Sequence, residues 1–115
     1  MTNEKQENIV LLESFNKLED NWDGYNAAAP TKELIEFVKR FVVQACFQPE
    51  IFPTPDGGIQ LEYTMHGNRH LNIEVFGDGT ACVFEMYADK TYSEETVEFE
   101  FSYINRRVNK FYDVA

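Results

Sequence analysis

Apolar residues in the first part of the chain recur at helical spacing. Leu12, Phe15 and Leu18 follow one another at three-residue intervals, which predicts a first helix over residues 4–19. Asp23-Gly24 then indicates a turn, because glycine adopts positive φ without steric cost. Thr31 is a suitable N-cap for a second helix, whose broad apolar stripe is typical of a helix packed against a sheet. The stripe consists of Leu34, Ile35, Phe37, Val38, Phe41, Val42, Ala45 and Cys46.

The period of the apolar residues changes to two in the second half of the chain. Alternation predicts strands at 51–53, 59–66, 70–75, 81–86 and 97–102. Turns that contain glycine separate the first four strands, and the polar stretch 88–95 precedes the last. Pro53 indicates that the first of these strands lies at a sheet edge. Such closely spaced strands are typical of an antiparallel meander with one buried face.

Helical spacing returns near the end of the chain. Ile104, Val108 and Phe111 predict a short helix over residues 103–114. An alternative begins this helix near Ser93, but the alternation around Phe99 favours a strand first.

These elements predict an α+β fold. We expect a two-layer sandwich, with two N-terminal helices packed on a four- to five-stranded antiparallel meander and a short C-terminal helix. A length of 115 residues suits one domain spanning 1–115. The first residues lack the basic and apolar regions of a signal peptide, and no apolar run is long enough to cross a membrane, so we expect a cytoplasmic protein.

The composition is strongly acidic. Twenty Asp and Glu residues against ten Lys and Arg give a formal net charge of −10. Such a charge repels nucleic acids and anionic membranes and attracts basic proteins. The alternative is that the charge serves only to keep the protein soluble.

The alternation along the strands gathers part of this charge on one face. We expect the helices to cover Ile59, Leu61, Leu71, Ile73, Cys82, Phe84, Val97 and Phe99. The opposite face then carries Glu62, Glu74, Glu85, Glu98 and Glu100. Like charges on neighbouring strands cost stability, so these residues indicate a binding face for a basic partner. The alternative is an ordinary solvated face.

No catalytic, metal-binding or cofactor-binding motif is recognisable. His66 and His70 could join a nearby glutamate at a metal, but a Gly-Asn turn separates them and no zinc motif supports this role. Cys46 and Cys82 fit buried free thiols better than a disulfide. Trp22 and Tyr25 suggest either an aromatic contact site or, for Trp22, a contribution to the core.

Two segments carry a resemblance to known proteins. Residues 21–27, Asn-Trp-Asp-Gly-Tyr-Asn-Ala, and residues 55–63, Pro-Asp-Gly-Gly-Ile-Gln-Leu-Glu-Tyr, resemble a group of small bacterial proteins. That group has Asn-Trp-Asp-Gly-Tyr-Gly-Ala before a helix and a hairpin of the type Pro-Asp-Gly-Gly-Ile-Gln-Leu-Glu-Trp after it. Asn26 and Tyr63 depart from this pattern at one position in each segment. The resemblance implies a non-secreted accessory protein, compatible with an immunity or antitoxin role, and supplies no catalytic residue.

We therefore predict a protein without enzymatic activity that neutralises a basic toxin domain, such as a toxic nuclease, by direct contact. Two alternatives remain at this point. One is a small metal-dependent enzyme using His66 and His70, and the other is a structural module that forms homodimers.

Overall fold

The structure, a computed structural model, describes residues 2–113. Two N-terminal helices, a five-stranded antiparallel sheet and a short C-terminal helix make up the chain, which confirms the expected α+β class. The helical elements are α1 (Asn3–Ser14), the 3₁₀ turn η1 (Phe15–Lys17), α2 (Lys32–Gln44) and α3 (Phe101–Phe111). The strands are β1 (Glu50–Pro53), β2 (Ile59–Met65), β3 (Arg69–Val75), β4 (Thr80–Met86) and β5 (Tyr92–Glu98).

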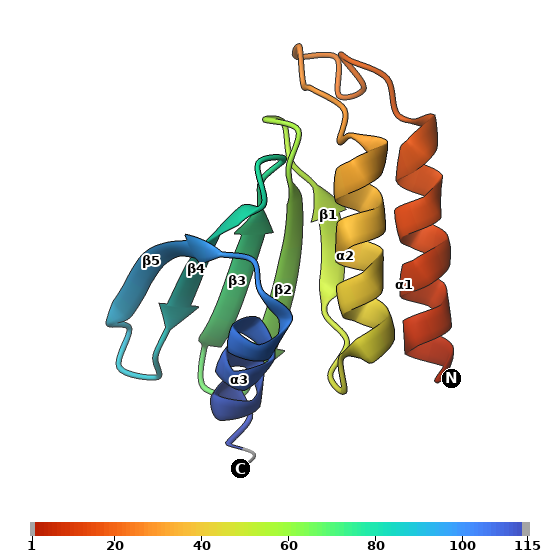
Figure 1. Cartoon of the computed structure of the whole chain (residues 1–115). Helices are drawn as coiled ribbons and strands as arrows, with labels where there is room; N and C mark the ends of the chain where they lie inside the picture. The colour runs from red at the N-terminus through yellow and green to blue at the C-terminus, as the bar shows by residue number, and fades with distance from the viewer. Residues whose placement is uncertain (1, 114–115) are drawn as a thin grey trace.

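The strands form a simple meander in the order β1-β2-β3-β4-β5. β1 and β5 lie at the two edges of this sheet (Figure 1). Helices α1 and α2 lie side by side next to β1, and α3 lies in front of the middle strands in the same view. Within residues 2–113, no helix is long and apolar enough to cross a membrane.

One hydrophobic cluster joins all three α-helices to one face of the sheet. Leu12 of α1, Ile35 of α2 and Ile104 of α3 are fully buried in it, together with Leu61 and Ile73 of the sheet. Because these side chains alternate with polar ones along each strand, the other face of the sheet remains uncovered by this core.

Several expected boundaries shift in the structure. α1 ends at Ser14, and the turn η1 replaces the last part of the helix expected over 4–19. β5 begins at Tyr92, ahead of the expected strand, and α3 begins at Phe101. The prediction of one continuous strand over 97–102 was therefore wrong. Glu100 explains the early helix start, because its carboxylate accepts hydrogen bonds from the backbone N–H groups of Ser102 and Tyr103. The end of the expected C-terminal helix, Val114, lies outside the described residues.

The faces of β4 are the reverse of those expected. Val83 and Glu85 point into the core, whereas Cys82 and Phe84 lie on the opposite face. The cause is visible in the register: Val83 lies opposite the buried Ile73 of β3. Both faces of β4 carry apolar side chains, so alternation within this strand does not indicate which face is inward.

The cysteines are free, as expected, but their predicted burial was wrong for Cys46. Cys46 is exposed because α2 ends at Gln44, two residues before it, and Ala45 occupies the core in its place. Cys82 is partly buried on the face of β4 that points away from the core.

Candidate protein-binding face

The sheet face that points away from the core carries five glutamates. We call the strand residues on this side the open face. Its members are Glu50, Phe52, Gln60, Glu62, Thr64, His70, Asn72, Glu74, Thr80, Cys82, Phe84, Met86, Tyr92, Glu94, Thr96 and Glu98. No Lys or Arg occurs among these residues, so the face has one sign of charge.

The strand register aligns several of these carboxylates in one row with an aromatic side chain. One row across the sheet runs through Glu50, Glu62, Asn72, Phe84 and Glu94. Glu50 and Glu62 are direct neighbours on β1 and β2, so two like charges face each other there. Such a pair opposes folding in the free protein, and a cation placed between its members relieves the repulsion.

Aromatic side chains accompany the acids. The rings of Phe84 and Tyr92 lie with centroids 5.4 Å apart, and Tyr92 is 65% exposed. Phe52 at the β1 edge is 42% exposed. A surface that combines carboxylates with exposed aromatic rings is suited to Lys and Arg side chains, which pair with the acids and lay their alkyl or planar groups on the rings.

Three of the five predicted contact residues lie on this face, and two do not. Glu62, Glu74 and Glu98 are on the open face as expected. Glu85 points inward and is 9% exposed, and Glu100 caps the N-terminus of α3. Their assignment to the same face was therefore wrong.

Sequence reasoning also missed Glu50 and Glu94. Glu50 starts the short edge strand β1, and Glu94 lies in the part of β5 that precedes the clear apolar alternation. Their pairings with β2 and β4 place them on the open face, and only the register reveals this.

The carboxyl group of Glu74 interacts with that of Asp56 in the β1–β2 turn. Burial, a hydrogen bond with Asp56 and the charge of Asp56 raise the pKa of Glu74. Burial alone would raise the pKa of Asp56 as well, but hydrogen bonds from Thr54, Glu74 and the N–H of Gly58 outweigh it and lower that pKa. Glu74 therefore holds a proton more readily than an ordinary glutamate does.

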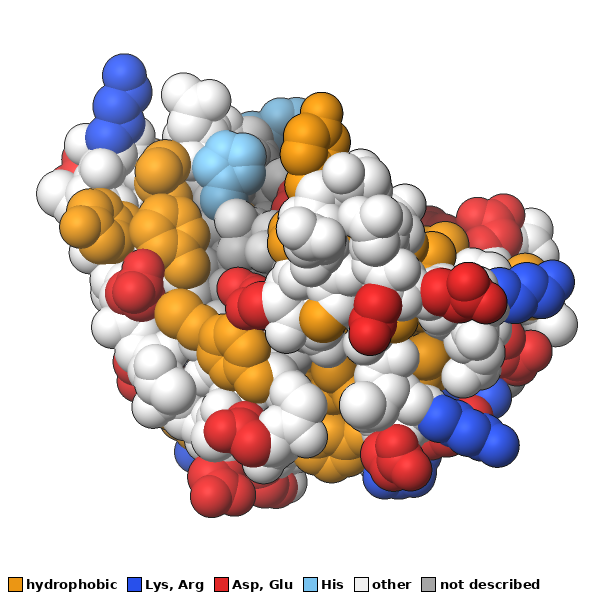
Figure 2. All heavy atoms as spheres, turned by 90° about the horizontal axis from the view of Figure 1, so that it is seen from above, with side chains coloured by type: hydrophobic (Ala, Val, Ile, Leu, Met, Phe, Trp, Pro, Cys, Tyr) orange, Lys and Arg blue, Asp and Glu red, His pale blue; other side chains and the backbone are white. Residues whose placement is uncertain are grey.

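The two segments that carry the family resemblance meet at the same end of the molecule. The Ala28 N–H donates to the Pro55 carbonyl at 2.8 Å, and Ala28 forms a parallel bridge with Asp56. Trp22 Nε1 donates to the Ala28 carbonyl at 2.9 Å, which gives Trp22 a structural role, whereas Tyr25 is 87% exposed. Figure 2 looks onto the molecule from this side and shows Asp and Glu side chains spread over it, with Lys and Arg at its margins.

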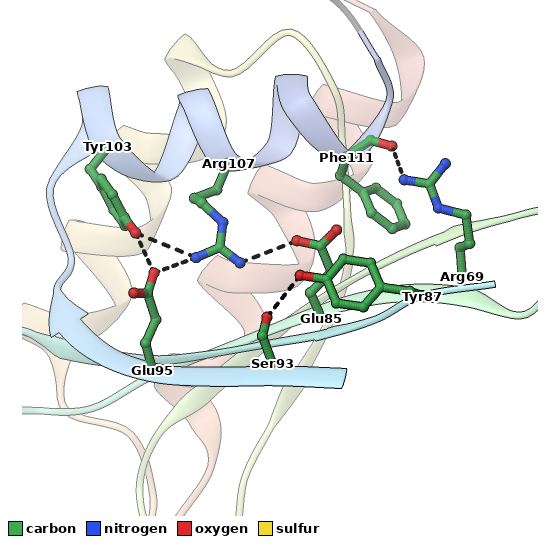
Figure 3. A network of polar contacts seen from close by, with 8 residues as sticks. All are labelled: Arg69, Glu85, Tyr87, Ser93, Glu95, Tyr103, Arg107 and Phe111. Carbon is green, nitrogen blue, oxygen red and sulfur yellow. Dashed lines mark hydrogen bonds and ion pairs between the residues drawn. The ribbon is translucent and has the colours of Figure 1, made fainter. Parts of the chain in front are cut away.

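A second polar cluster lies between the sheet and α3, on the inward side. Arg107 bridges Glu85 of β4, at 3.2 Å, and Glu95 of β5 (Figure 3). The Tyr103 hydroxyl donates to Glu95 as well. Burial would lower the pKa of Arg107, but hydrogen bonds with Tyr103 and Glu85 and the charge of Glu95 outweigh it and raise that pKa. We call these four residues the Arg107 cluster, and its ion pairs explain how a glutamate can be buried in β4.

The histidines lie apart in different environments. His70 is on the open face between Thr64 and Met86, and His66 is exposed in the turn after β2. Among the described residues there is no group of three or more His, Cys, Asp or Glu side chains arranged to hold a metal ion.

Comparisons with protein-family models, curated proteins and solved structures give no match.

Proposed function

We propose that this chain is a binding protein without catalytic activity that neutralises a basic toxin domain, in the manner of an immunity protein or antitoxin. The observation that carries the proposal is the open face, where five glutamates on four strands occur without any Lys or Arg. We further propose that the chain acts in the cytoplasm as a single two-layer domain.

Charge supports this proposal in two ways. A net charge of −10 on a small protein steers basic partners toward it and raises the association rate at low salt. Nuclease domains hold phosphates with Lys and Arg, so a face of carboxylates is complementary in charge to such a site.

The remaining charged groups favour binding over catalysis. Arg107, which lines a groove beside α3, is already engaged by Glu85 and Glu95. Lys39 similarly pairs with Glu13 and Glu36. These pairs have structural roles, whereas the carboxylates of the open face have no cationic partner in the salt bridges of residues 2–113.

The proposal is tested by capture of a partner followed by charge reversal. The protein is used as bait with the product of the neighbouring gene, and binding is then measured for the triple variant Glu62→Lys, Glu74→Lys and Glu98→Lys. We expect association to slow by at least about tenfold and its salt dependence to fall, because electrostatic steering is lost.

A matched control carries the same change in net charge elsewhere. The variant Glu4→Lys, Glu7→Lys and Glu19→Lys alters three exposed residues of the N-terminal region. If both triple variants bind equally well, net charge alone matters and the open face is not the contact surface. If the basic gene product does not bind the wild-type protein, the proposed neutralisation of that partner is wrong.

A further inference from the structure

β5 forms a long unpaired edge of the sheet. It pairs with β4 and with no other strand among residues 2–113, and it lies at the far side of the sheet from α1 and α2 (Figure 1). Its seven residues contain no proline, glycine or lysine. Proteins commonly protect such edges with proline, a bulge or charged side chains, because the free N–H and C=O groups can pair with another chain. The charges of β5 are all negative, so they oppose an acidic strand and admit a basic one.

The hydrogen bonds at both ends of β5 show which backbone groups point outward. The Tyr87 N–H donates to the Thr91 carbonyl at 2.8 Å, and the Phe99 N–H donates to the Gly79 carbonyl at 2.9 Å. Because hydrogen-bonding direction alternates along an antiparallel strand, the odd-numbered residues between them face β4. The even-numbered residues Tyr92, Glu94, Thr96 and Glu98 therefore direct their backbone groups to the free edge.

One of these outward groups is already used. The Glu98 carbonyl accepts a hydrogen bond from the Glu100 N–H at 2.9 Å, where the chain turns into α3. Tyr92, Glu94 and Thr96 consequently offer both an N–H and a C=O group, and Glu98 offers its N–H. This is a ladder long enough for one added strand of ordinary length.

Different chemical surroundings flank the two sides of this edge. On the open-face side, Tyr92, Glu94 and Glu98 are exposed, and two of them carry negative charge. On the inward side, a groove of about 360 Å³ separates β5 from α3. Ser93, Glu95, Tyr103, Arg107 and Lys110 are among its lining residues, and Figure 3 shows most of them.

We propose that the free edge of β5 binds an extended basic segment of the partner by strand addition. In this arrangement, alternate side chains of the added strand lie beside Glu94 and Glu98, where Lys or Arg is favoured. The intervening side chains point toward the groove beside α3, which has room for small residues between Ser93 and Tyr103. This inference rests on the proposed function, since it specifies how the basic partner is held.

Charge argues against a second copy of this chain as the occupant. β5 contains Glu94, Glu95 and Glu98 among its seven residues. Antiparallel pairing of two such strands would bring these carboxylates close to one another across the new ladder. Like charges on adjacent strands are destabilising, so a basic strand fits this edge better than another β5 does.

The probe for this proposal is a blocked seven-residue peptide, Lys-Thr-Lys-Val-Lys-Thr-Lys. Its control is the same peptide with every backbone nitrogen methylated, which keeps the charge and removes the hydrogen-bond donors. Binding is followed by ¹H–¹⁵N spectra and amide hydrogen exchange of the full chain. We expect the unmethylated peptide to slow exchange at Tyr92, Glu94, Thr96 and Glu98, and the methylated peptide to have no effect there.

Two variants test the same contact from the protein side. Thr96→Pro removes an outward N–H and leaves the bonds to β4 intact, and Thr96→Ala is its matched control. We expect Thr96→Pro to weaken peptide binding by at least about fivefold, equivalent to one lost hydrogen bond, and Thr96→Ala to bind like wild type. If Thr96→Pro fails to fold, the methylated peptide still decides the question.

The outcomes separate this inference from the proposed function. Equal binding of both peptides, with spectral changes over β2 and β3, would overturn strand addition and leave the acidic binding face in place. Peptide binding that survives the double variant Glu62→Lys with Glu74→Lys, which leaves Glu94 and Glu98 of β5 unchanged, but is lost with Thr96→Pro would support the edge and count against the face. Absence of peptide binding at millimolar concentration, or a concentration-dependent dimer that protects β5 without peptide, would overturn the inference.

Discussion

Replacing Arg107 with methionine tests whether the Arg107 cluster holds α3 to the sheet. The guanidinium group spans Glu85 on β4 and Glu95 on β5, and its side chain is 17% exposed. The Glu85 side chain is 12% exposed, so the substitution leaves a carboxylate in a largely dry site without its cation. Methionine fills much of the same volume, which limits the loss of packing.

The expected cost follows from the burial of each pair. Removing one partner of a buried pair typically costs about 3–5 kcal/mol, because the remaining charge is left unpaired. The Glu95 side chain is 40% exposed, so its pair with Arg107 contributes below about 1 kcal/mol. We therefore expect the free energy of unfolding to fall by about 3 kcal/mol, and the melting temperature by roughly 10 °C.

The assay is urea denaturation at neutral pH, followed by circular dichroism. Glu95→Gln is the matched single variant, with an expected loss below about 1 kcal/mol. The double variant Arg107→Met with Glu85→Leu should recover most of the lost stability, because no charge then remains buried. A loss below about 1 kcal/mol for Arg107→Met alone, with an unchanged denaturant slope, would refute the argument that Glu85 depends on Arg107.

Three further substitutions test other features of the fold. Gly58→Ala should destabilise the protein by roughly 1–3 kcal/mol in urea denaturation, because the new Cβ would lie 2.8 Å from the Val75 carbonyl oxygen. Its control is Gly77→Ala, whose Cβ meets no atom within 4 Å and which should change stability by less than about 0.5 kcal/mol. Tyr63→Phe should be neutral or stabilise by up to about 1 kcal/mol in thermal melts, since the Tyr63 hydroxyl is buried without a hydrogen-bond partner; a clear loss would reveal an interaction of that hydroxyl. The raised pKa of Glu74 contributes stability that is fully present below its unfolded pKa and is lost as the pH rises through the folded value. Glu74→Gln should therefore raise the free energy of unfolding at pH 7 by less than about 1 kcal/mol, seen as a slightly higher melting temperature, with no gain below about pH 4. An equal effect at both pH values would contradict a raised pKa of Glu74.

The sequence by itself determined the class of fold and most of its elements. Helical spacing in α2 and two-residue alternation in β2 and β3 identify their buried faces, since their apolar side chains lie on one side, with exposed Val43 of α2 as an exception. The acidic composition is read directly from the sequence. The alternation in β2 and β3 also places Glu62 and Glu74 on the side opposite the core.

Only the tertiary structure decided the faces of β4 and the full membership of the open face. In β4, Val83 and Phe84 are both apolar, so the strand pattern is ambiguous, and the register with Ile73 selects Val83 for the core. Glu85 then points inward, where Arg107, 22 residues further along the chain, compensates its charge. The register of β5 on β4 sets the position of Glu94 on the open face. Spacing within one segment determines which side chains share a face, but contacts between distant segments determine which of two comparable faces is buried.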